Sequence, residues 1–201
     1  MKPPMMPSLA LGMVLALPAV AQQNCPTAAE LTRGIRIDFI DGSTETFRSQ
    51  GGGTMVVDGR EADGADYRLE LAQGLHLLGY EVMVDGRPDP TATVTYDYGM
   101  APDALPVPVP LARHTLGVTP RDSQGTWIET QTHAYGAMES VLIGGCTYDM
   151  FSAVILYDTE SFYTEGLNYL PELGLGYLLW TETTDEVRVP NAAIGIRAVT
   201  K

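Results

Sequence analysis

Apolar and polar residues alternate along much of the chain, in short runs that end at turn dipeptides. Residues 35–40 alternate before Asp41-Gly42, and residues 43–48 run toward three consecutive glycines at 51–53. Alternation with a period of two predicts β-strands, and Asp-Gly between extended runs predicts a hairpin, because both residues accept a positive φ. The same dipeptide recurs at residues 58–59, 63–64 and 85–86. Four such turns predict a meander of antiparallel strands.

The segment 67–84 fits two interpretations, since its leucines match both the alternation of a strand and the spacing of a helix. Gly74 and Gly79 each disfavour a helix by roughly 1 kcal/mol relative to alanine. We therefore predict two strands here. A further strand is predicted over residues 91–98, which are rich in β-branched and aromatic side chains.

A proline-rich segment follows. Four prolines lie within residues 99–112, where they remove backbone donors and favour an extended linker. From residue 126 the alternation resumes. We predict strands there over residues 126–135, 138–143, 147–157, 161–169, 175–182 and 192–199.

These patterns predict an all-β protein with no long helix after residue 24. We expect a single domain over residues 22–201, with the 99–112 linker between its two halves. The predicted architecture is a strongly curved antiparallel sheet, either a half-barrel or a sandwich, of about ten strands.

The first 21 residues have the pattern of a secretory signal peptide. Lys2 is the only charged residue before Glu30, an apolar run covers residues 9–20, and the run closes on small residues at Ala19 and Ala21. This run is too short to span the roughly 30 Å hydrocarbon core of a bilayer as a helix. We expect cleavage after Ala21 and a periplasmic or secreted mature chain without a transmembrane segment. A retained N-terminal anchor is the alternative.

The two cysteines, Cys25 and Cys146, both follow this segment. An even number of cysteines in an oxidising compartment favours a disulfide, and only one intramolecular pairing exists. On the chain-entropy model, a bond closing so long a loop contributes on the order of 4–5 kcal/mol. Two free thiols or an intermolecular bridge are the alternatives.

Charge limits the classes of partner. The chain carries 25 acidic and 12 basic residues, a formal net charge of −13. Phosphate recognition depends on clustered lysine and arginine, so we expect no nucleic-acid partner, and anionic lipid is disfavoured for the same reason. A hydrophobic fraction of 45% is that of a folded globular protein.

The last third contains the most distinctive string. Cys146-Thr147-Tyr148-Asp149 is followed, over residues 163–177, by an aromatic strand that leads into Leu-Pro-Glu-Leu-Gly-Leu-Gly. Over residues 125–182 the chain resembles uncharacterised exported antiparallel-β proteins of alphaproteobacteria. The resemblance implies a fold and an envelope location, and it implies no activity.

The residues of this string also have a direct physical interpretation. Gly174 and Gly176 allow a tight reversal or a close approach of another backbone. The aromatic side chains around them supply a large apolar surface that fits either a structural core or the lip of a ligand site. The candidate ligand-binding residues are Tyr163, Tyr169, Tyr177 and Trp180.

Catalytic and cofactor motifs are largely absent. The sequence has no nucleophile elbow, no phosphate-binding loop, and no zinc-ligand spacing among His76, His114 and His133. We therefore predict no cofactor and favour a non-enzymatic role.

His133 is the one weak catalytic candidate. Alternation places it on the same strand face as Gln131 and Tyr135, and Glu129 or Glu139 would be its carboxylate partner in general base catalysis. The alternative is a surface histidine without a catalytic role. A calcium site is a separate candidate.

The candidate calcium ligands are Asp58, Asp63 and Asp66, which crowd one predicted turn. They lack the regular ligand order and the bidentate glutamate of known calcium loops.

Three functions remain open. The first is a non-catalytic periplasmic envelope protein that binds an apolar small molecule or a protein partner on its curved sheet. The second is a small periplasmic hydrolase that uses His133 and a carboxylate. The third is a structural or assembly factor that pairs its sheet edges with another envelope protein.

Overall fold

The computed structural model describes residues 24–158, 163–185 and 188–200, so the predicted signal peptide lies outside the described residues. Within these ranges, thirteen strands form one antiparallel sheet, accompanied by the short 3₁₀ helices η1 (Ala28–Thr32) and η2 (Pro102–Ala104). No helix in the described ranges has the length and apolar character needed to cross a bilayer. The strands are β1 (Ile35–Phe39), β2 (Thr44–Gly51), β3 (Thr54–Arg60), β4 (Asp66–Ala72), β5 (His76–Val84), β6 (Arg87–Asp97), β7 (Arg113–Arg121), β8 (Glu129–Tyr135), β9 (Glu139–Ile143), β10 (Cys146–Asp158), β11 (Tyr163–Leu170), β12 (Leu175–Thr183) and β13 (Ala193–Ala198).

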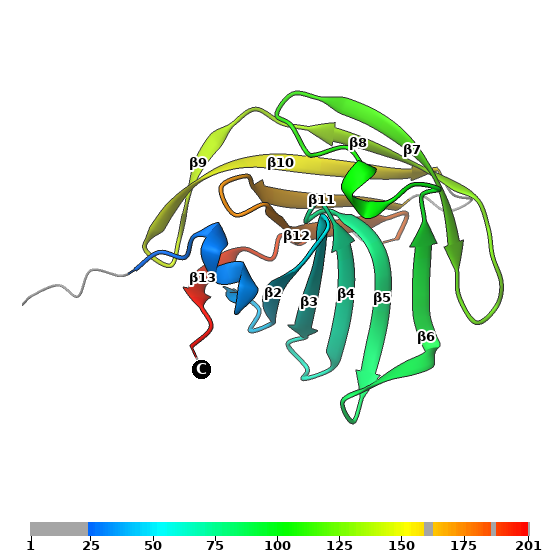
Figure 1. Cartoon of the computed structure of the whole chain (residues 1–201), viewed down its shortest axis with the longest axis horizontal. Coiled ribbons are helices and arrows are strands. Elements are labelled where there is room, and N and C mark those ends of the chain that lie inside the picture. The colour runs from blue at the N-terminus through cyan, green and yellow to red at the C-terminus, as the bar shows by residue number, and fades with distance from the viewer. Residues whose placement is uncertain (1–23, 159–162, 186–187, 201) are drawn as a thin grey trace, which may run out of the picture.

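The sheet bends strongly, so that its two parts face each other across the core (Figure 1). Its strand order is β12-β11-β10-β8-β7-β6-β5-β4-β3-β2-β1-β13, and β9 pairs with β10 beside this path. We call β1–β6 with β13 the first arm and β7–β12 the second arm. The arms join where β6 meets β7 along only three residue pairs, from Thr95↔Arg121 to Asp97↔Thr119. A short ladder allows the sheet to turn sharply at this point.

The predicted strongly curved, all-β antiparallel architecture is confirmed, with thirteen described strands in place of about ten. The segment 67–84 forms two strands, β4 and β5, as predicted. Two strands have no counterpart among the predicted ranges. β3 covers residues 54–60, where a turn at Asp58-Gly59 was expected, and in β7 Gly117 and Pro120 obscured an alternation that buries Leu116 and Val118.

The 99–112 segment connects β6 to β7 and packs on the sheet. Leu105 in this connection is 2% exposed, and the Pro106 carbonyl lies 2.8 Å from Nε2 of His76. The segment therefore joins two neighbouring strands of the same sheet, and it covers part of the core.

Three of the four predicted Asp-Gly turns are present, and the one at Asp58-Gly59 is not. Both residues lie within β3, where Gly59 pairs with Glu45 of β2 and with Tyr67 of β4. A Cβ on Gly59 would lie 2.0 Å from the ring of Tyr67. Glycine is needed here because an aromatic ring lies over the strand, and not because the chain turns.

Two hairpin tips fasten the arms together. Gly74, between β4 and β5, accepts a 2.7 Å hydrogen bond from the backbone of Gly176, and a Cβ on Gly74 would lie 2.0 Å from the carbonyl oxygen of Gly174. Tyr169 on β11 also donates to the carbonyl of Gln73, at 3.1 Å. The glycines of the distinctive string therefore serve the close backbone approach that the sequence suggested.

A disulfide closes the molecule at one end. Cys25 and Cys146 are bonded, with their Cα atoms 5.5 Å apart and a sequence separation of 121. Tyr148, two residues after Cys146, donates a 2.9 Å hydrogen bond to the carbonyl of Pro26. These contacts hold the segment before η1 against the start of β10, and the predicted pairing is confirmed.

The ends of the sheet are partly covered by neighbouring segments. The backbone of Asn191 donates to the carbonyl of Leu179 on edge strand β12, at 2.7 Å. At the other end, a Cβ on Gly144 in the β9–β10 turn would lie 3.0 Å from Gly195 on β13. These contacts cover part of edge strand β12 and part of edge strand β13.

Candidate ligand-binding cavity

A cavity of about 290 Å³ lies between the two arms, on the inner face of the curved sheet. Leucines from β4, β5 and β11 form much of its wall. Aromatic rings complete the wall, and carboxyl groups interrupt it. The aromatic lining residues are Phe47, Tyr67, Tyr80, Tyr96, Tyr163 and Tyr177, and the acidic ones are Glu45, Glu61 and Glu165.

Strand register explains how Glu45 comes to be inside. On β2 it alternates with Phe47, so both side chains face the core, and Glu45 is only 6% exposed. Glu45, Gly59 and Tyr67 lie side by side on β2, β3 and β4. Since Gly59 has no side chain, the ring of Tyr67 lies over it and its hydroxyl donates a 2.8 Å hydrogen bond to Oε1 of Glu45. Oε2 of Glu45 is buried without a hydrogen-bond partner.

Glu165 enters the cavity from the second arm in a similar way. It lies on β11 between Tyr163 and Leu167, which line the same cavity. The hydroxyls of Tyr157 and Tyr163 donate to its two carboxylate oxygens at 2.7 and 2.8 Å. Each arm thus contributes one glutamate that is held by tyrosine hydroxyls.

Burial dominates the electrostatics of these carboxyl groups. It raises the pKa of Glu45 to about 7, against the lowering effect of the hydrogen bond from Tyr67, and the charge of Glu61 adds to the rise. Burial also raises the pKa of Glu165, although the hydrogen bonds from Tyr157 and Tyr163 oppose it. Within the described residues no arginine forms an ion pair with Glu45 or Glu165. The cavity is therefore apolar in its walls and short of positive charge.

The four predicted ligand-binding aromatics divide into two pairs. Tyr163 and Tyr177 line the cavity. Tyr169 is buried in the contact between the hairpin tips, which is a structural role. Trp180 lines a smaller hollow of about 190 Å³, and Glu45 and Tyr67 line both this hollow and the cavity. The guanidinium carbon of Arg188 lies over the Trp180 ring, 3.9 Å from its centroid.

His133 lies in the core and not on the surface. It is fully buried on β8, on one face with Gln131 and Tyr135 as the alternation indicated. Both of its ring nitrogens lack hydrogen-bond partners, and the Glu129 carboxylate accepts instead from Gln131 and Trp127. Without a carboxylate partner for His133, the hydrolase interpretation has no supporting geometry in the described part of the chain.

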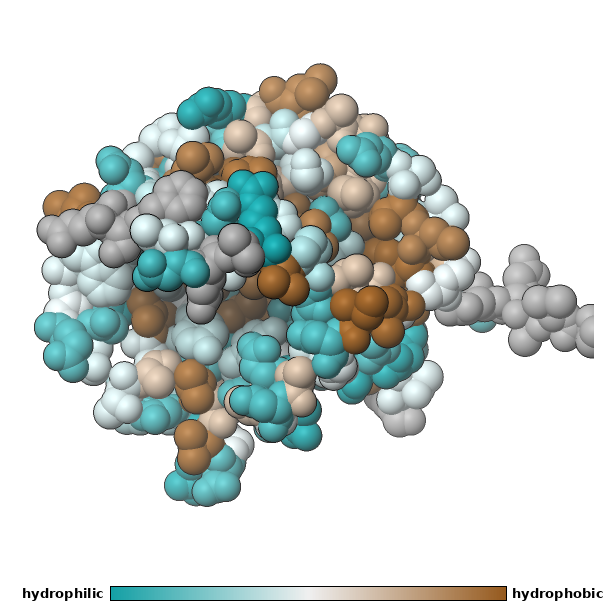
Figure 2. Space-filling model, turned by 180° about the vertical axis from the view of Figure 1, so that it is seen from behind, coloured by the Kyte–Doolittle hydropathy of each residue, from teal (hydrophilic) through white to brown (hydrophobic). Residues whose placement is uncertain are grey.

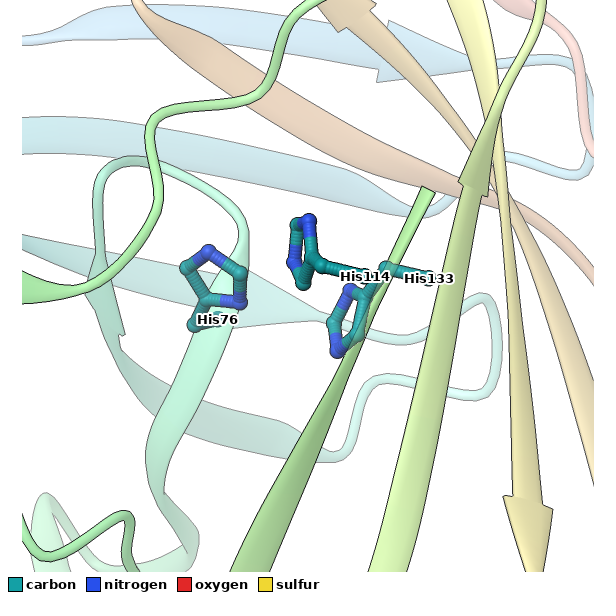
Figure 3. Close-up of side chains that lie close together, drawn as sticks. All are labelled: His76, His114 and His133. Carbon is teal, nitrogen blue, oxygen red and sulfur yellow. The ribbon is translucent and has the colours of Figure 1, made fainter. Parts of the chain in front are cut away.

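His76 and His114 lie beside His133 (Figure 3). The sequence held no sign of this group, because its members come from β5, β7 and β8. Burial lowers the pKa of His133 to about 3 and that of His76 to about 4, and it also lowers the pKa of the half-buried His114. All three imidazoles are therefore neutral at neutral pH.

The aspartates considered for calcium are engaged by other groups. Asp58 forms ion pairs with Arg48 and Arg68, and Asp66 forms one with Arg60. Oδ1 of Asp63 accepts the backbone N–H of Ala65 at 2.9 Å. Guanidinium groups thus pair with Asp58 and Asp66, and a backbone N–H is bound by Asp63.

On the face opposite to that of Figure 1, apolar surface residues form several separate patches among polar ones (Figure 2). A single broad apolar patch on this face would have marked a docking surface for a protein there. The cavity between the two arms gathers apolar, aromatic and acidic side chains and is the candidate site.

Comparison with known proteins assigns no family to this chain. No family model matches it, and no curated protein matches its sequence. Among solved structures, the hypothetical lipoprotein YmcC from Escherichia coli K12 is similar, with 11% identity and a TM-score of 0.42, over 79% of this chain and 81% of YmcC.

Proposed function

We propose that this chain is a non-catalytic, exported binding protein that holds a small amphipathic organic cation in the cavity between its arms. The observation that carries this proposal is the placement of Glu45 and Glu165. Each is turned into an otherwise apolar and aromatic cavity, and neither is neutralised by an arginine in the described structure.

The chemistry of the walls favours a cation with an apolar body. A carboxylate in an apolar environment is costly unless an opposite charge accompanies it, so a bound cation would relieve that cost. Tyrosine rings attract cations at their faces, and Tyr67 and Tyr80 stack with centroids 6.2 Å apart at the cavity wall. The leucines would contact the apolar part. The volume of about 290 Å³ lies just below the ordinary range of ligand pockets, about 300–1,000 Å³, which suits a short-chain ligand.

The disulfide supports the location. A bond between Cys25 and Cys146 persists in oxidising compartments and is rare in the cytosol. The N-terminal pattern points to the same export route. A protein of the envelope or periplasm would meet membrane-derived and external amphiphiles.

Calorimetric titration tests the proposal with three probes of equal chain length: octyltrimethylammonium, octyl sulfate and octanol. We expect saturable one-to-one binding of the ammonium compound, with clear preference over the other two. Glu165→Gln should weaken that binding by at least about tenfold, because a charge partner is lost in a desolvated site.

Asp149→Asn is the matched control, since it removes one negative charge from an exposed position on β10. It should leave binding unchanged. Equal binding of octanol and octyltrimethylammonium would refute the cation preference, and absence of binding by all three probes would refute the binding function.

A further inference from the structure

Three histidines meet at one point inside the second arm and the adjoining start of β5 (Figure 3). His114 and His133 are cross-strand neighbours on β7 and β8, and their rings stack with centroids 4.9 Å apart. His76 approaches from β5, with its ring centroid 4.9 Å from that of His133. These are all the histidines of the 201-residue chain.

The ring of His76 is held in one orientation. Its Nε2 lies 2.8 Å from the carbonyl oxygen of Pro106, which accepts only, so Nε2 carries the proton. Nδ1 is then the atom with the free lone pair, and it is buried without a partner. A backbone carbonyl that fixes the tautomer in this way is the usual support of a metal-binding imidazole.

His133 is the stronger anomaly. It is fully buried, and neither ring nitrogen has a hydrogen-bond partner. Buried polar atoms nearly always have a hydrogen-bond partner, and a buried polar atom without one is energetically unfavourable. A ligand that accepts lone pairs at this point would satisfy Nδ1 of His76 and the unprotonated ring nitrogen of His133 together.

Distances permit such a ligand. One nitrogen from each ring can be chosen so that the three lie within 4.8 Å of one another. Around a zinc ion with Zn–N bonds of about 2.0–2.1 Å, tetrahedral ligands are roughly 3.3 Å apart, so each ring must move inward by less than about 1 Å. We propose that His76, His114 and His133 form a binding site for one transition-metal ion, with zinc as the ion that fits the donor set.

The donor set selects the class of metal. Three neutral imidazoles suit zinc, copper or nickel and do not suit calcium or magnesium, which require oxygen ligands. Three protein ligands leave a fourth position for a small molecule such as water. His114 is only half-buried, which gives the ion a route of entry.

The site is separate from the cavity of the proposed function. On the inner face, Ile155 of β10 lies between His133 of β8 and Glu165 of β11. No histidine lines the cavity. Metal binding and cation binding can therefore fail independently, and each has its own experiment.

The test uses tag-free, oxidised full-length protein, freed of metal by a chelator. Both cysteines are in the disulfide and cannot bind zinc. We expect calorimetry to show one zinc ion per chain. Long-range ¹⁵N NMR of the three histidines should show Nδ1 of His76 and one nitrogen of each other ring shifting on zinc addition.

Variants identify the ligands. His114→Ala and His133→Gln should each weaken zinc binding by more than about 100-fold, since loss of even a group that only orients a ligand costs about 10–100-fold. Asp66→Asn, which removes a half-exposed carboxylate on β4, should bind zinc as the unmodified chain does. If His133→Gln does not fold, the half-buried His114→Ala decides. Absence of saturable zinc binding, or unchanged binding by a folded His114→Ala, would overturn the site.

Discussion

At the scale of single residues, alternation predicts which side chains share a face but not which face is inside. It correctly placed His133 with Gln131 and Tyr135. It could not show that this face is the core, because the other arm, which covers it, is distant in sequence. A polar residue at an inward position, such as Glu45 beside Phe47, is the signal that would have indicated a site.

Glu45 makes folding stability depend on pH in a specific direction. Its carboxyl has a folded pKa of about 7, raised from 4.5 by burial. The folded state therefore keeps a proton between these values that the unfolded state releases. The stabilisation is fully present below pH 4.5 and is lost as pH rises toward 7, by roughly 3 kcal/mol in total.

Urea unfolding of the unmodified chain and of Glu45→Gln at pH 5 and pH 8 measures this effect. A glutamine amide can still accept the hydrogen bond from Tyr67 but does not ionise. We expect the difference in unfolding free energy between the two proteins to shift in favour of the variant as pH rises. A difference that stays constant with pH would show that Glu45 titrates normally.

At the scale of elements, sequence patterns identified most strands, and their failures have local causes. The Asp58-Gly59 pair has turn chemistry, yet it lies within β3 because Tyr67 requires a neighbour without a side chain. In β7, Gly117 and Pro120 conceal an alternation that is completed only by pairing with β8. Both errors arise because a residue can be selected by its partner on the next strand.

The hairpin tips offer a matched pair of substitutions. Gly74 and Gly174 have nearly equal φ values of +66° and +65°, so alanine adds similar backbone strain at each, about 1–2 kcal/mol. A Cβ on Gly174 meets nothing within 4 Å, whereas one on Gly74 would lie 2.0 Å from the Gly174 carbonyl oxygen. Gly74→Ala should therefore destabilise the fold by a further 1–3 kcal/mol or so, as overpacking does.

Chemical unfolding gives the loss of unfolding free energy in each variant. The difference between the two losses measures the contact between the arms. Gly174→Ala serves as the control for backbone strain. Equal losses of stability in the two variants would mean that the two hairpin tips are not in contact.

At the scale of the whole molecule, the curvature of the sheet was predictable in kind but the meeting of its arms was not. Strand patterns carry no information on which turn of one arm contacts which turn of the other. The cavity and the histidine group both depend on this meeting or on pairing between strands far apart in the chain. The disulfide was predictable because two cysteines allow one pairing only.

That disulfide has its largest effect on the unfolded chain. It joins residues separated by 121 positions, so it restricts the unfolded ensemble much more than a short loop would. Replacing both cysteines, as Cys25→Ala with Cys146→Ala, should lower the unfolding free energy by about 2–5 kcal/mol. Guanidinium unfolding of the oxidised chain, the reduced chain and the double variant measures this. The reduced chain and the double variant should have the same unfolding free energy, because the stability comes from the restriction of the unfolded chain and not from the sulfur atoms. A double variant as stable as the oxidised chain would show that the disulfide is not needed. The contact of Tyr148 with Pro26 and the packing of η1 would then be enough to hold the N-terminal segment against β10.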